Sequence, residues 1–452
     1  MKNTAIHKDW TQGGVVRNLW LLSWPIMVSQ TLTVIGPTID MIWVGKLGPS
    51  AIAAVGVAGM IVMAINSVMM GLYTGLRAMV ARFIGAGDKA SAVSVGQQTL
   101  VIGVVFSLIS ALVGIFLAEP MLSLFGVEAD VVSVGAGYMR IQLSGSIVMS
   151  LAMITQMIMQ ASGDTVNPMR ISVIFRLLHL GLCPALVFGW SIFPEMGVNG
   201  AALSDVISQC VGASIGIWYV FSGRTRLKLT LKGFHLDKDI LWRMMKIGIP
   251  SSITGFQRFV PYLVVVLFVS PFGTAAVGAN SLMQRIDNFI RMPAGALGSA
   301  AGVLAGQNIG AGKPERAEKG GWVAVALYSG AMVIVSVLIW FFAEEVVRLF
   351  NSDPELVGIA AGFMRIQILG YLVIGPTVVL SLCIEGVGDT IPTMIGTLFT
   401  MWAVQVPLAW ALPEFTSLGV NGTQWAITIA LVARAVIFII YFRTGRWKKK
   451  AV

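Results

Sequence analysis

Long apolar runs separated by short polar segments extend over most of the chain, from about residue 18 to residue 442. Each run holds about 20 residues or more, which is the length that an α-helix needs to cross the hydrocarbon core of a bilayer. The pattern therefore predicts an all-α polytopic membrane protein with twelve transmembrane helices. They are expected at about residues 18–44, 52–82, 93–118, 130–161, 167–190, 199–222, 243–270, 275–307, 320–343, 356–386, 391–412 and 420–442.

The same short motifs occur in both halves of the chain at a nearly constant separation. The sequence Ile-Gly-Ala-Gly at residues 84–87 recurs 225 positions later at 309–312, and Met-Arg-Ile-Gln at 139–142 recurs at 364–367. The chain is therefore expected to contain a duplicated unit of about half its length. Two halves derived from one ancestor are typical of secondary transporters, in which the substrate path runs between them.

The repeat predicts two pseudo-symmetric six-helix lobes, at residues 1–222 and 247–452, joined by a basic cytoplasmic linker at 223–246. Basic residues gather on the side that holds both termini, whereas the other side has only Lys46 and Arg348. This excess of Lys and Arg predicts that both termini lie in the cytoplasm. Because six is an even number of spans, both lobes should enter the membrane from the same side.

Composition supports a multi-pass protein of the cytoplasmic membrane. Of the 452 residues, 56% are hydrophobic and 12% are charged, whereas soluble domains carry roughly 25% charged residues. The net charge of +10 is interpreted as membrane topology, because no basic stripe alternates with aromatic residues as in nucleic-acid binding proteins. Small organic molecules and membrane lipids are the expected partners, and the protein is expected to be a monomer.

The sequence carries no pattern typical of an enzyme, a metal centre or a channel. Cys183, Cys210 and Cys383 lie singly in apolar segments, without the spacing of a metal or redox motif. The sequence has no Walker A or HExxH motif and no Gly-x-Ser-x-Gly at a strand-to-helix turn, so neither catalysis nor a cofactor is expected. A re-entrant pore loop with filter residues is also missing. Protons or sodium are expected as coupling ions.

Charged residues inside the spans need a reason, because each costs at least roughly 2.5–3.5 kcal/mol near the bilayer centre. Asp40 and Asp205 belong to the first half alone, since their repeat partners are Val265, 225 positions later, and Ile427, at the separation of 222 by which Gly-Val-Asn-Gly at 197–200 recurs at 419–422. Counting along the helices places both carboxylates roughly 8 Å below the same membrane face. Two such groups could share a proton or flank a sodium ion. We therefore predict that they form the cation-coupling site.

Simpler interpretations of these residues remain open at the level of sequence. Asp40 could reach outward to pair with Lys46, and Asp205 could be a capping or interfacial acid near a helix start. His179 lies one helical turn before Cys183 and could relay protons, since its unperturbed pKa is about 6.5. A neutral packing histidine explains the pattern equally well.

The predicted substrate cavity draws on both halves. Thr33 lies seven residues before Asp40, on the same face of a helix that contains Pro25 and Pro37. Proline removes a backbone hydrogen bond, so protonation of Asp40 could change a bend in this helix and disturb the bound compound. Methionines adapt to varied shapes, and Met63 and Met153 are expected to line the cavity together with Cys183.

In the second half, Arg258, Arg285 and Asp287 lie near mid-membrane by count and have uncharged repeat partners. They are predicted either to line the cavity or to form a structural ion-pair cluster that includes Arg291, four residues after Asp287. Charged residues that are present in both halves, such as Arg140 with Arg365, are instead expected to serve helix packing or bending. Asp164 and Asp389, in repeated Gly-Asp-Thr turns, are expected to cap helix starts.

Several motifs resemble one transporter family over nearly the whole chain. The first span begins Trp24-Pro25 and continues through Asp40 to Gly48, residues 306–312 read Gly-Gln-Asn-Ile-Gly-Ala-Gly, and residues 163–165 are followed by Pro168. In this order, and repeated, these motifs resemble the MATE family of multidrug and toxic compound extruders. The resemblance implies a cation-coupled antiporter that exports organic, usually cationic, compounds.

Within that family the chain is most similar to the DinF-like branch. The NorM-like branch has acids in the seventh and tenth helices, but the matching positions here lie near Arg258 and Ile374. The DinF-like branch uses an Asp in the first helix, which Asp40 matches. Its Asn-x-x-x-Asp-Pro motif in the fifth helix corresponds to residues 179–184, with His179 in place of Asn and Cys183 in place of Asp. Asp205 could replace that missing carboxylate.

The sequence thus predicts a secondary active antiporter that exports amphiphilic or cationic organic compounds by alternating access. Coupling to protons is favoured over coupling to sodium. The alternative is a flippase for a lipid or lipid-linked precursor, which needs a basic groove that lipid can reach. Arg258, Arg285 and Arg291 keep this alternative open.

Overall fold

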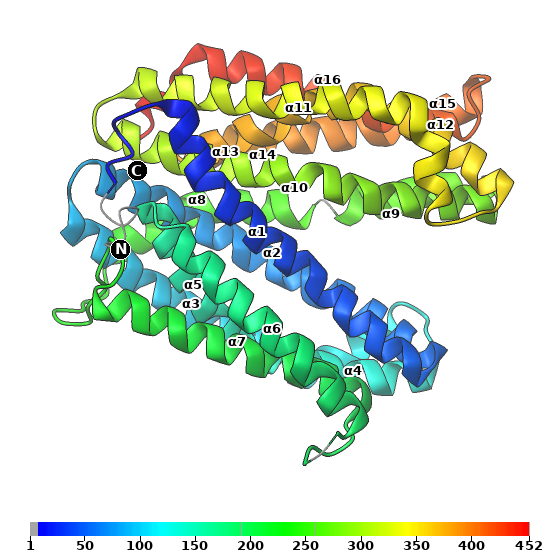
Figure 1. The fold of residues 1–452 in the computed structure, drawn as a ribbon, viewed down its shortest axis with the longest axis horizontal. Helices are drawn as coiled ribbons and strands as arrows, with labels where there is room; N and C mark the ends of the chain where they lie inside the picture. Colours follow the sequence, from blue (N-terminus) through cyan, green and yellow to red (C-terminus); the bar gives the residue numbers. More distant parts are fainter. Residues whose placement is uncertain (1–7, 191, 258, 452) are drawn as a thin grey trace. The chain divides into compact units, whose positions relative to one another are not determined.

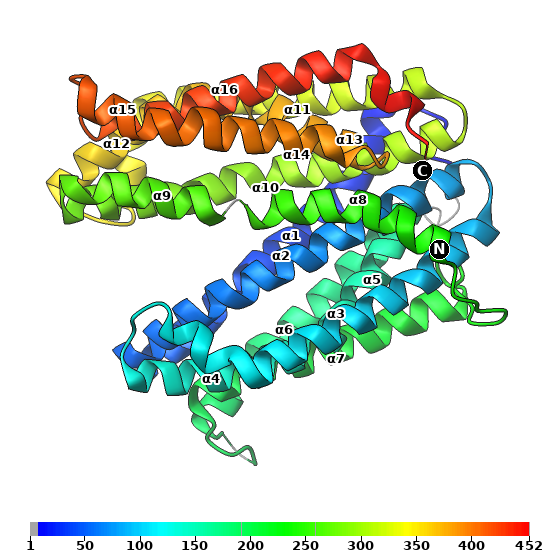
Figure 2. The same ribbon diagram turned by 180° about the vertical axis from the view of Figure 1, so that it is seen from behind.

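The computed structural model describes residues 8–190, 192–257 and 259–451, and the elements in these ranges are helices (Figures 1 and 2). The chain forms two compact units. The first unit comprises Met1–Asp9 and Trp24–Gly248, and the second comprises Trp10–Ser23 and Ile249–Val452. Each unit has its own set of packed helices, as expected for a duplicated sequence.

The first unit contains long helices that pack along one another. Their bounds are α1 (Val15–Val44), α2 (Pro49–Gly85), α3 (Lys89–Ser123), α4 (Ala129–Ser144), α5 (Ser146–Ser162), α6 (Val166–Phe188) and α7 (Gly197–Ser222), with a short 3₁₀ turn, η1, at Gly45–Leu47. Helix α1 begins in the second unit and enters the first at Trp24, and α8 (Lys238–Phe256) starts in the first unit. Helices α4 and α5 meet at a bend of 45° and together form one span.

The second unit repeats this plan with more interruptions. Its elements are α9 (Phe259–Val269), η2 (Ser270–Phe272), α10 (Thr274–Gly310), α11 (Pro314–Arg348), α12 (Pro354–Ile374), η3 (Gly375–Val379), α13 (Leu380–Glu385), α14 (Thr390–Phe399), η4 (Thr400–Gln405), α15 (Val406–Phe415), α16 (Asn421–Thr444) and η5 (Arg446–Lys449). Elements η3 and η4 are π-helical turns. Such turns are rare and are frequent at functional sites.

The predicted all-α membrane architecture is confirmed. Within the described residues, nine helices are long and apolar enough to cross a membrane, and the bent pair α4–α5 makes a tenth span. The two remaining predicted spans correspond to α8 with α9 and to α10. Helix α10 is long enough to cross but less apolar, because its first half carries Arg285, Asp287 and Arg291.

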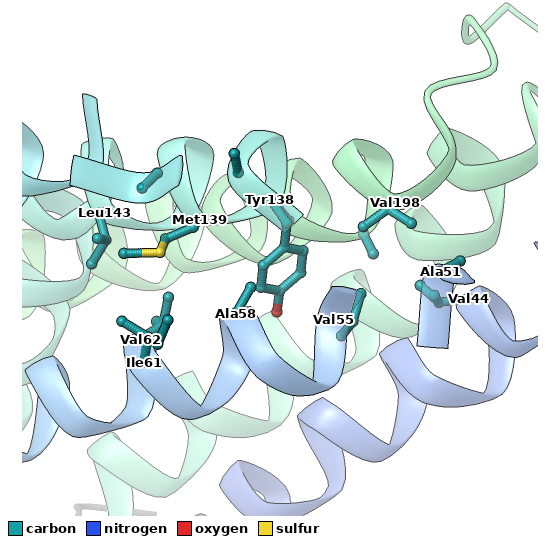
Figure 3. Close-up of a cluster of buried hydrophobic side chains, with 14 of the residues drawn as sticks. Val44, Ala51, Val55, Ala58, Ile61, Val62, Tyr138, Met139, Leu143 and Val198 are labelled. Carbon is teal, nitrogen blue, oxygen red and sulfur yellow. The ribbon is translucent and has the colours of Figure 1, made fainter. Parts of the chain in front are cut away.

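An apolar core joins the helices of the first unit at one end. Val55, Ala58 and Val62 of α2 are buried against α4. Figure 3 shows the ring of Tyr138, on α4, reaching toward α2 between Ala58 and Val55. The same cluster includes Ile39 and Cys183 from α1 and α6. Burial of these side chains, at roughly 25 cal/mol per Å² of apolar surface, fixes the positions of the helices that carry the polar residues described below.

The repeated Gly-Asp-Thr turns differ between the units. Asp164 Oδ1 accepts a hydrogen bond from the Asn167 backbone N–H at 3.2 Å, so the predicted helix cap is confirmed there. Burial raises the pKa of the Asp164 carboxyl. The predicted cap at Asp389 is wrong, because its side chain does not cap α14. Its carboxylate accepts a hydrogen bond from Tyr441 and lies 3.2 Å from Lys450 Nζ, so it holds the chain that follows α16.

Arg140 and Arg365 occupy equivalent places in the two units. Arg140 lies 2.8 Å from Glu119, and Arg365 lies 3.4 Å from Glu344. The two glutamates are also 225 positions apart. Each pair joins consecutive helices, α3 to α4 and α11 to α12, at positions where the side chains are well exposed. The duplicated charges therefore serve the packing of neighbouring helices in each unit.

Close helix contact at Gly386 generates a stability prediction. A Cβ atom at this position would lie 2.4 Å from Gly302 Cα of α10. Gly386→Ala should therefore force the backbones apart and lower the free energy of unfolding by about 1–3 kcal/mol, which is typical of overpacking. The measurement is the apparent Tm of the protein purified in detergent.

Gly330→Ala on α11 is the matched control, since the added methyl group would have no neighbouring atom within 4 Å and the helix gains propensity. Its Tm should stay equal or rise slightly. Equal Tm values for Gly386→Ala and the unchanged protein would contradict the close contact of α10 with residue 386.

Candidate functional site

Three predicted site residues meet inside the first unit, between α1 and α6. His179 Nε2 lies 3.1 Å from Asp40 Oδ1, and Cys183 Sγ donates toward the same oxygen across 3.6 Å. Asp40 is 4% exposed, and His179 and Cys183 are fully buried. His179 and Cys183 are four residues apart on α6, so both side chains project from one helix face toward Asp40. The carboxylate is therefore enclosed by donors instead of water.

A fourth residue, Arg176, extends this cluster along the same face of α6. Its Nη1 lies 2.9 Å from His179 Nδ1. Because arginine has only donors, Nδ1 must be the acceptor in this hydrogen bond. The ring proton then resides on Nε2, which faces Asp40. His179 is thus held as a neutral imidazole that presents its N–H to the carboxylate.

Gly36 gives the Arg176 guanidinium its place against α1. A Cβ atom at residue 36 would lie 2.2 Å from Arg176 Nη1. Any side chain at this position would displace the guanidinium. Gly36, which directly precedes Pro37, therefore provides the room for a buried charge.

Asp205 of α7 joins the same electrostatic cluster. Its Oδ2 accepts hydrogen bonds from Gln209 at 2.7 Å and from Gln142 at 3.4 Å. Its charge acts on both Asp40 and Arg176. The structure thus places the two predicted acids in one cluster, each with its own hydrogen-bond donors and with Arg176 as their shared countercharge.

The predicted alternatives of an Asp40–Lys46 pair and of a capping role for Asp205 are wrong. Lys46 Nζ lies over the ring of Trp43, 4.5 Å from its centroid, while Asp40 faces His179. Asp205 is not a cap, because α7 already begins at Gly197. Both carboxylates are therefore used inside the helix bundle of the first unit.

The second unit has apolar residues at the equivalent places. Val265, the repeat partner of Asp40, is 2% exposed and belongs to a buried apolar cluster. Ile427, the repeat partner of Asp205, packs against that same cluster. A unit of this design therefore folds around hydrophobic contacts at these positions. The polar cluster of the first unit is not a requirement of the fold.

Asp40, His179 and Cys183 could each offer one ligand atom to a metal ion, and these atoms lie within 4.8 Å of one another. A histidine ligand must present a nitrogen lone pair to the metal. Here Nδ1 already accepts from Arg176, and Nε2 carries the proton. A divalent cation would also lie close to a buried guanidinium. The arrangement therefore fits proton exchange at Asp40 and does not fit a metal centre.

The residues predicted to line the substrate cavity are dispersed over the first unit. Thr33 on α1 and Met63 on α2 are exposed, and Met153 on α5 is half-buried. Thr33 Oγ1 donates to the Ser29 carbonyl on its own helix. Cys183 differs from this group, because it is fully buried and contacts Asp40.

The second unit carries a separate polar cluster. Tyr371 Oη donates to Asp287 Oδ1 at 2.8 Å, and Arg291 Nη2 lies 4.0 Å from Asp287 Oδ2. The Asp287 side chain is 15% exposed and that of Arg291 is 31% exposed. Arg285 is exposed. Arg258, predicted for the same cavity, lies outside the described residues.

Sequence reasoning missed Arg176, Gly36 and Tyr371. A signal for Arg176 was present, because Arg176, His179 and Cys183 follow one another at spacings of three and four residues on one helix face. Gly36 could not be found in this way, since its role depends on the approach of a side chain from α6. Tyr371 could not be found either, because it donates a hydrogen bond to Asp287, which lies 84 positions away in the sequence.

Known proteins resemble the chain along nearly its whole length. The MatE family model matches residues 25–185 and 250–411. A probable multidrug resistance protein, YoeA of Bacillus subtilis, is 26% identical over 445 residues, which cover 97% of this chain and 95% of that protein. A probable multidrug resistance protein, NorM of Thermotoga maritima, is 26% identical over 448 residues, which cover 96% and 94% of the two chains.

Solved structures share the fold. A MATE protein crystallised in a bent conformation superposes with a TM-score of 0.92 at 23% identity, and the match covers 99% of each chain. The two segments of the family model fall in the two halves of the chain and correspond to its internal repeat. Together with the helical architecture, these matches establish that the chain belongs to the MatE family of membrane transporters.

Proposed function

We propose that this transporter exports amphiphilic or cationic organic compounds and that proton binding at Asp40 drives the export. The observation that carries the proposal is the contrast between the repeats. Where the second unit buries Val265 and packs Ile427 against the same apolar cluster, the first unit holds Asp40 and Asp205 among hydrogen-bond donors. Charges that the fold does not need are expensive in a membrane and usually serve function.

The cluster provides the parts of a proton site. Ionised Asp40 lies 3.1 Å from His179 Nε2 and accepts from the Cys183 thiol. When a proton binds the carboxylate, one buried negative charge is removed and the attraction between Asp40 and Arg176 is lost. Release of that proton restores the charge. A group whose interactions change with protonation in this way can favour one conformation when loaded and another when empty.

Helix α1 is the element through which we expect this change to act. Asp40 lies three residues after Pro37, which cannot donate a backbone hydrogen bond to the preceding turn. Gly36 leaves room beside α1 for the Arg176 guanidinium, which attracts Asp40. Loss of the negative charge would therefore weaken the hold on α1 near its least constrained turn, and the exposed Thr33 lies on that same turn.

Export of organic compounds is proposed from the family and from the names of the relatives, two of which are called probable multidrug resistance proteins. The flippase alternative needs a basic groove. Of the three arginines that kept this alternative open, Arg291 lies near Asp287, Arg285 is exposed, and Arg258 lies outside the described residues. This partial neutralisation favours amphiphilic or cationic cargo over an anionic lipid headgroup.

The proposed setting follows the charge distribution of the sequence. We propose that the protein acts as a monomer in the cytoplasmic membrane, with both termini in the cytoplasm. Its substrate path would open alternately to the two sides of the membrane. A proton gradient would drive transport, without a cofactor. Sodium is the alternative coupling ion that the first experiment tests.

Replacement of the acids tests the proposal. In proteoliposomes with an inward proton gradient and no sodium, export of a fluorescent organic cation should fall about tenfold or more in Asp40→Asn, since that factor lies within the usual range of coupling free energies. Asp205→Asn should lower the rate less, because Asp40 keeps its His179 and Cys183 contacts. The measured quantity is the initial rate of dye movement.

Asp130→Asn is the control, because this acid lies at the exposed start of α4. Its transport rate should equal that of the unchanged protein. Equal rates for Asp40→Asn and Asp130→Asn would exclude Asp40 as the proton site, and a dependence on added sodium would show that the proposed coupling ion is wrong.

The Asp287 cluster generates a second prediction about cargo. Tyr371→Phe removes the hydroxyl that donates to Asp287 and leaves the ring in place. If this carboxylate contacts the cargo, the half-saturating concentration of a cationic dye should change, while the dependence of the rate on the proton gradient stays the same. A change in gradient dependence instead would assign the cluster to coupling.

A further inference from the structure

We propose that Arg176 selects the coupling ion: its guanidinium excludes sodium from the Asp40 site, so that a single proton is the ion exchanged there. The inference rests on the proposed function and deepens it. Arg176 occupies the middle of α6 and is 7% exposed. The repeat separation lies between 223 and 225 in this helix, so the equivalent position in the second unit is one of Phe399, Thr400 and Met401, which are all uncharged. The fold therefore accepts an uncharged residue there, and the charge has a different purpose.

The guanidinium is fixed from two sides. On α6 it donates to His179 Nδ1 at 2.9 Å. On α1 it packs so closely on Gly36 that a Cβ atom would lie 2.2 Å from Nη1. The charges of Asp205 and Asp40 both attract it. Arg176 is thus a permanent positive charge at a defined place between the two acids.

The charges of the cluster can be counted from these contacts. Arg176 contributes one positive charge, ionised Asp40 and Asp205 contribute two negative charges, and His179 is neutral because Nδ1 accepts from Arg176. The empty cluster therefore carries one net negative charge. Binding of one proton makes it neutral, which is the state that a low-dielectric interior favours.

The elements around Arg176 add no further charge. Helix α1 contributes Asp40, α7 contributes Asp205, and α5 has no titratable side chain in its sequence. Helix α4 contributes Tyr138, and α6 contributes Cys183, both of which are neutral near pH 7 at their ordinary pKa values. The count of one exchangeable proton therefore holds for the described residues that face the cluster.

Sodium is excluded by both charge and ligand chemistry. A hard cation such as sodium needs several oxygen ligands, as Ca²⁺ and Mg²⁺ do. Here Asp40 Oδ1 already faces the His179 N–H and the Cys183 thiol, which are donors and cannot ligate a cation in this arrangement. The fixed guanidinium repels any metal cation that approaches. A proton needs only one oxygen lone pair and meets neither obstacle.

Arg176→Gln tests this role directly. The substitution changes the net charge of the empty cluster from one negative to two negative, so a second cation can enter. Binding of radioactive sodium to the detergent-purified protein should be undetectable for the unchanged chain at physiological concentrations. For Arg176→Gln its affinity should rise about tenfold or more, since a unit charge a few ångströms away has been removed. Arg176→Lys should restore the exclusion.

Two further variants separate selection from a general structural effect. Gly36→Ala keeps the charge but displaces the guanidinium, so sodium binding should rise less than in Arg176→Gln. Arg170→Gln removes an exposed positive charge from the same helix and should leave sodium binding unchanged. In Asp40→Asn combined with Arg176→Gln, the added sodium binding should disappear.

The binding assay does not require transport, so its outcome is independent of the proposed export. Sodium binding by the unchanged chain that equals binding by Arg176→Gln would overturn the inference, even if proton-driven export is observed. The inference would also be overturned if Arg176→Gln and Arg176→Lys both fold, as judged by an unchanged Tm, and neither variant binds sodium. If Arg176→Gln does not fold, the sodium affinity of Gly36→Ala is the deciding measurement. A rise in that affinity supports the proposal, and an unchanged affinity shows that it is wrong.

Discussion

The hydrogen bond from Arg176 to His179 determines how the buried charges of the first unit are arranged. It makes Nδ1 an acceptor, places the ring proton on Nε2, and thereby turns an N–H toward Asp40. Without this bond, the ring could present a lone pair to the carboxylate, and Asp40 would be a buried anion next to another acceptor. That arrangement is costly in an apolar core. The interaction thus determines which ring nitrogen of His179 faces Asp40.

The two units share a helical architecture but differ in the residues at their centres. Both keep an Arg–Glu pair between consecutive helices, at Arg140 and at Arg365, and both keep a buried Asp in the Gly-Asp-Thr turn. Their centres differ, because Val265 packs where the first unit has Asp40. A polar residue that is present in both halves can nevertheless take part in the polar cluster of one unit. Gln142, which is present in both halves, donates to Asp205 in the first unit.

Much of the architecture and part of the site could be predicted from the sequence. Apolar runs and the 225-residue repeat indicated the helices and the two units, because span length and repetition are local properties of the chain. Asp40 and His179 were found as unusual polar residues in apolar helices and Cys183 through the resemblance to the family motif, and the structure brings the three together. Arg176 was passed over although it shares their helix face. The room at Gly36 and the Tyr371 contact depend on packing between distant segments, which no spacing in the sequence reveals.

The distribution of charge also separates two tasks that a transporter must combine. In the first unit, the acids are enclosed by donors and by Arg176, so that cluster responds to a proton more readily than to a large compound. In the second unit, Asp287 and Arg291 are partly exposed and only 4.0 Å apart, so they can contact a compound but are already close to neutral as a pair. The proposed proton site and a separate cargo site could be coupled only through a change in helix geometry. The proline-containing α1, which carries Asp40, is the element of the first unit best suited to such a change.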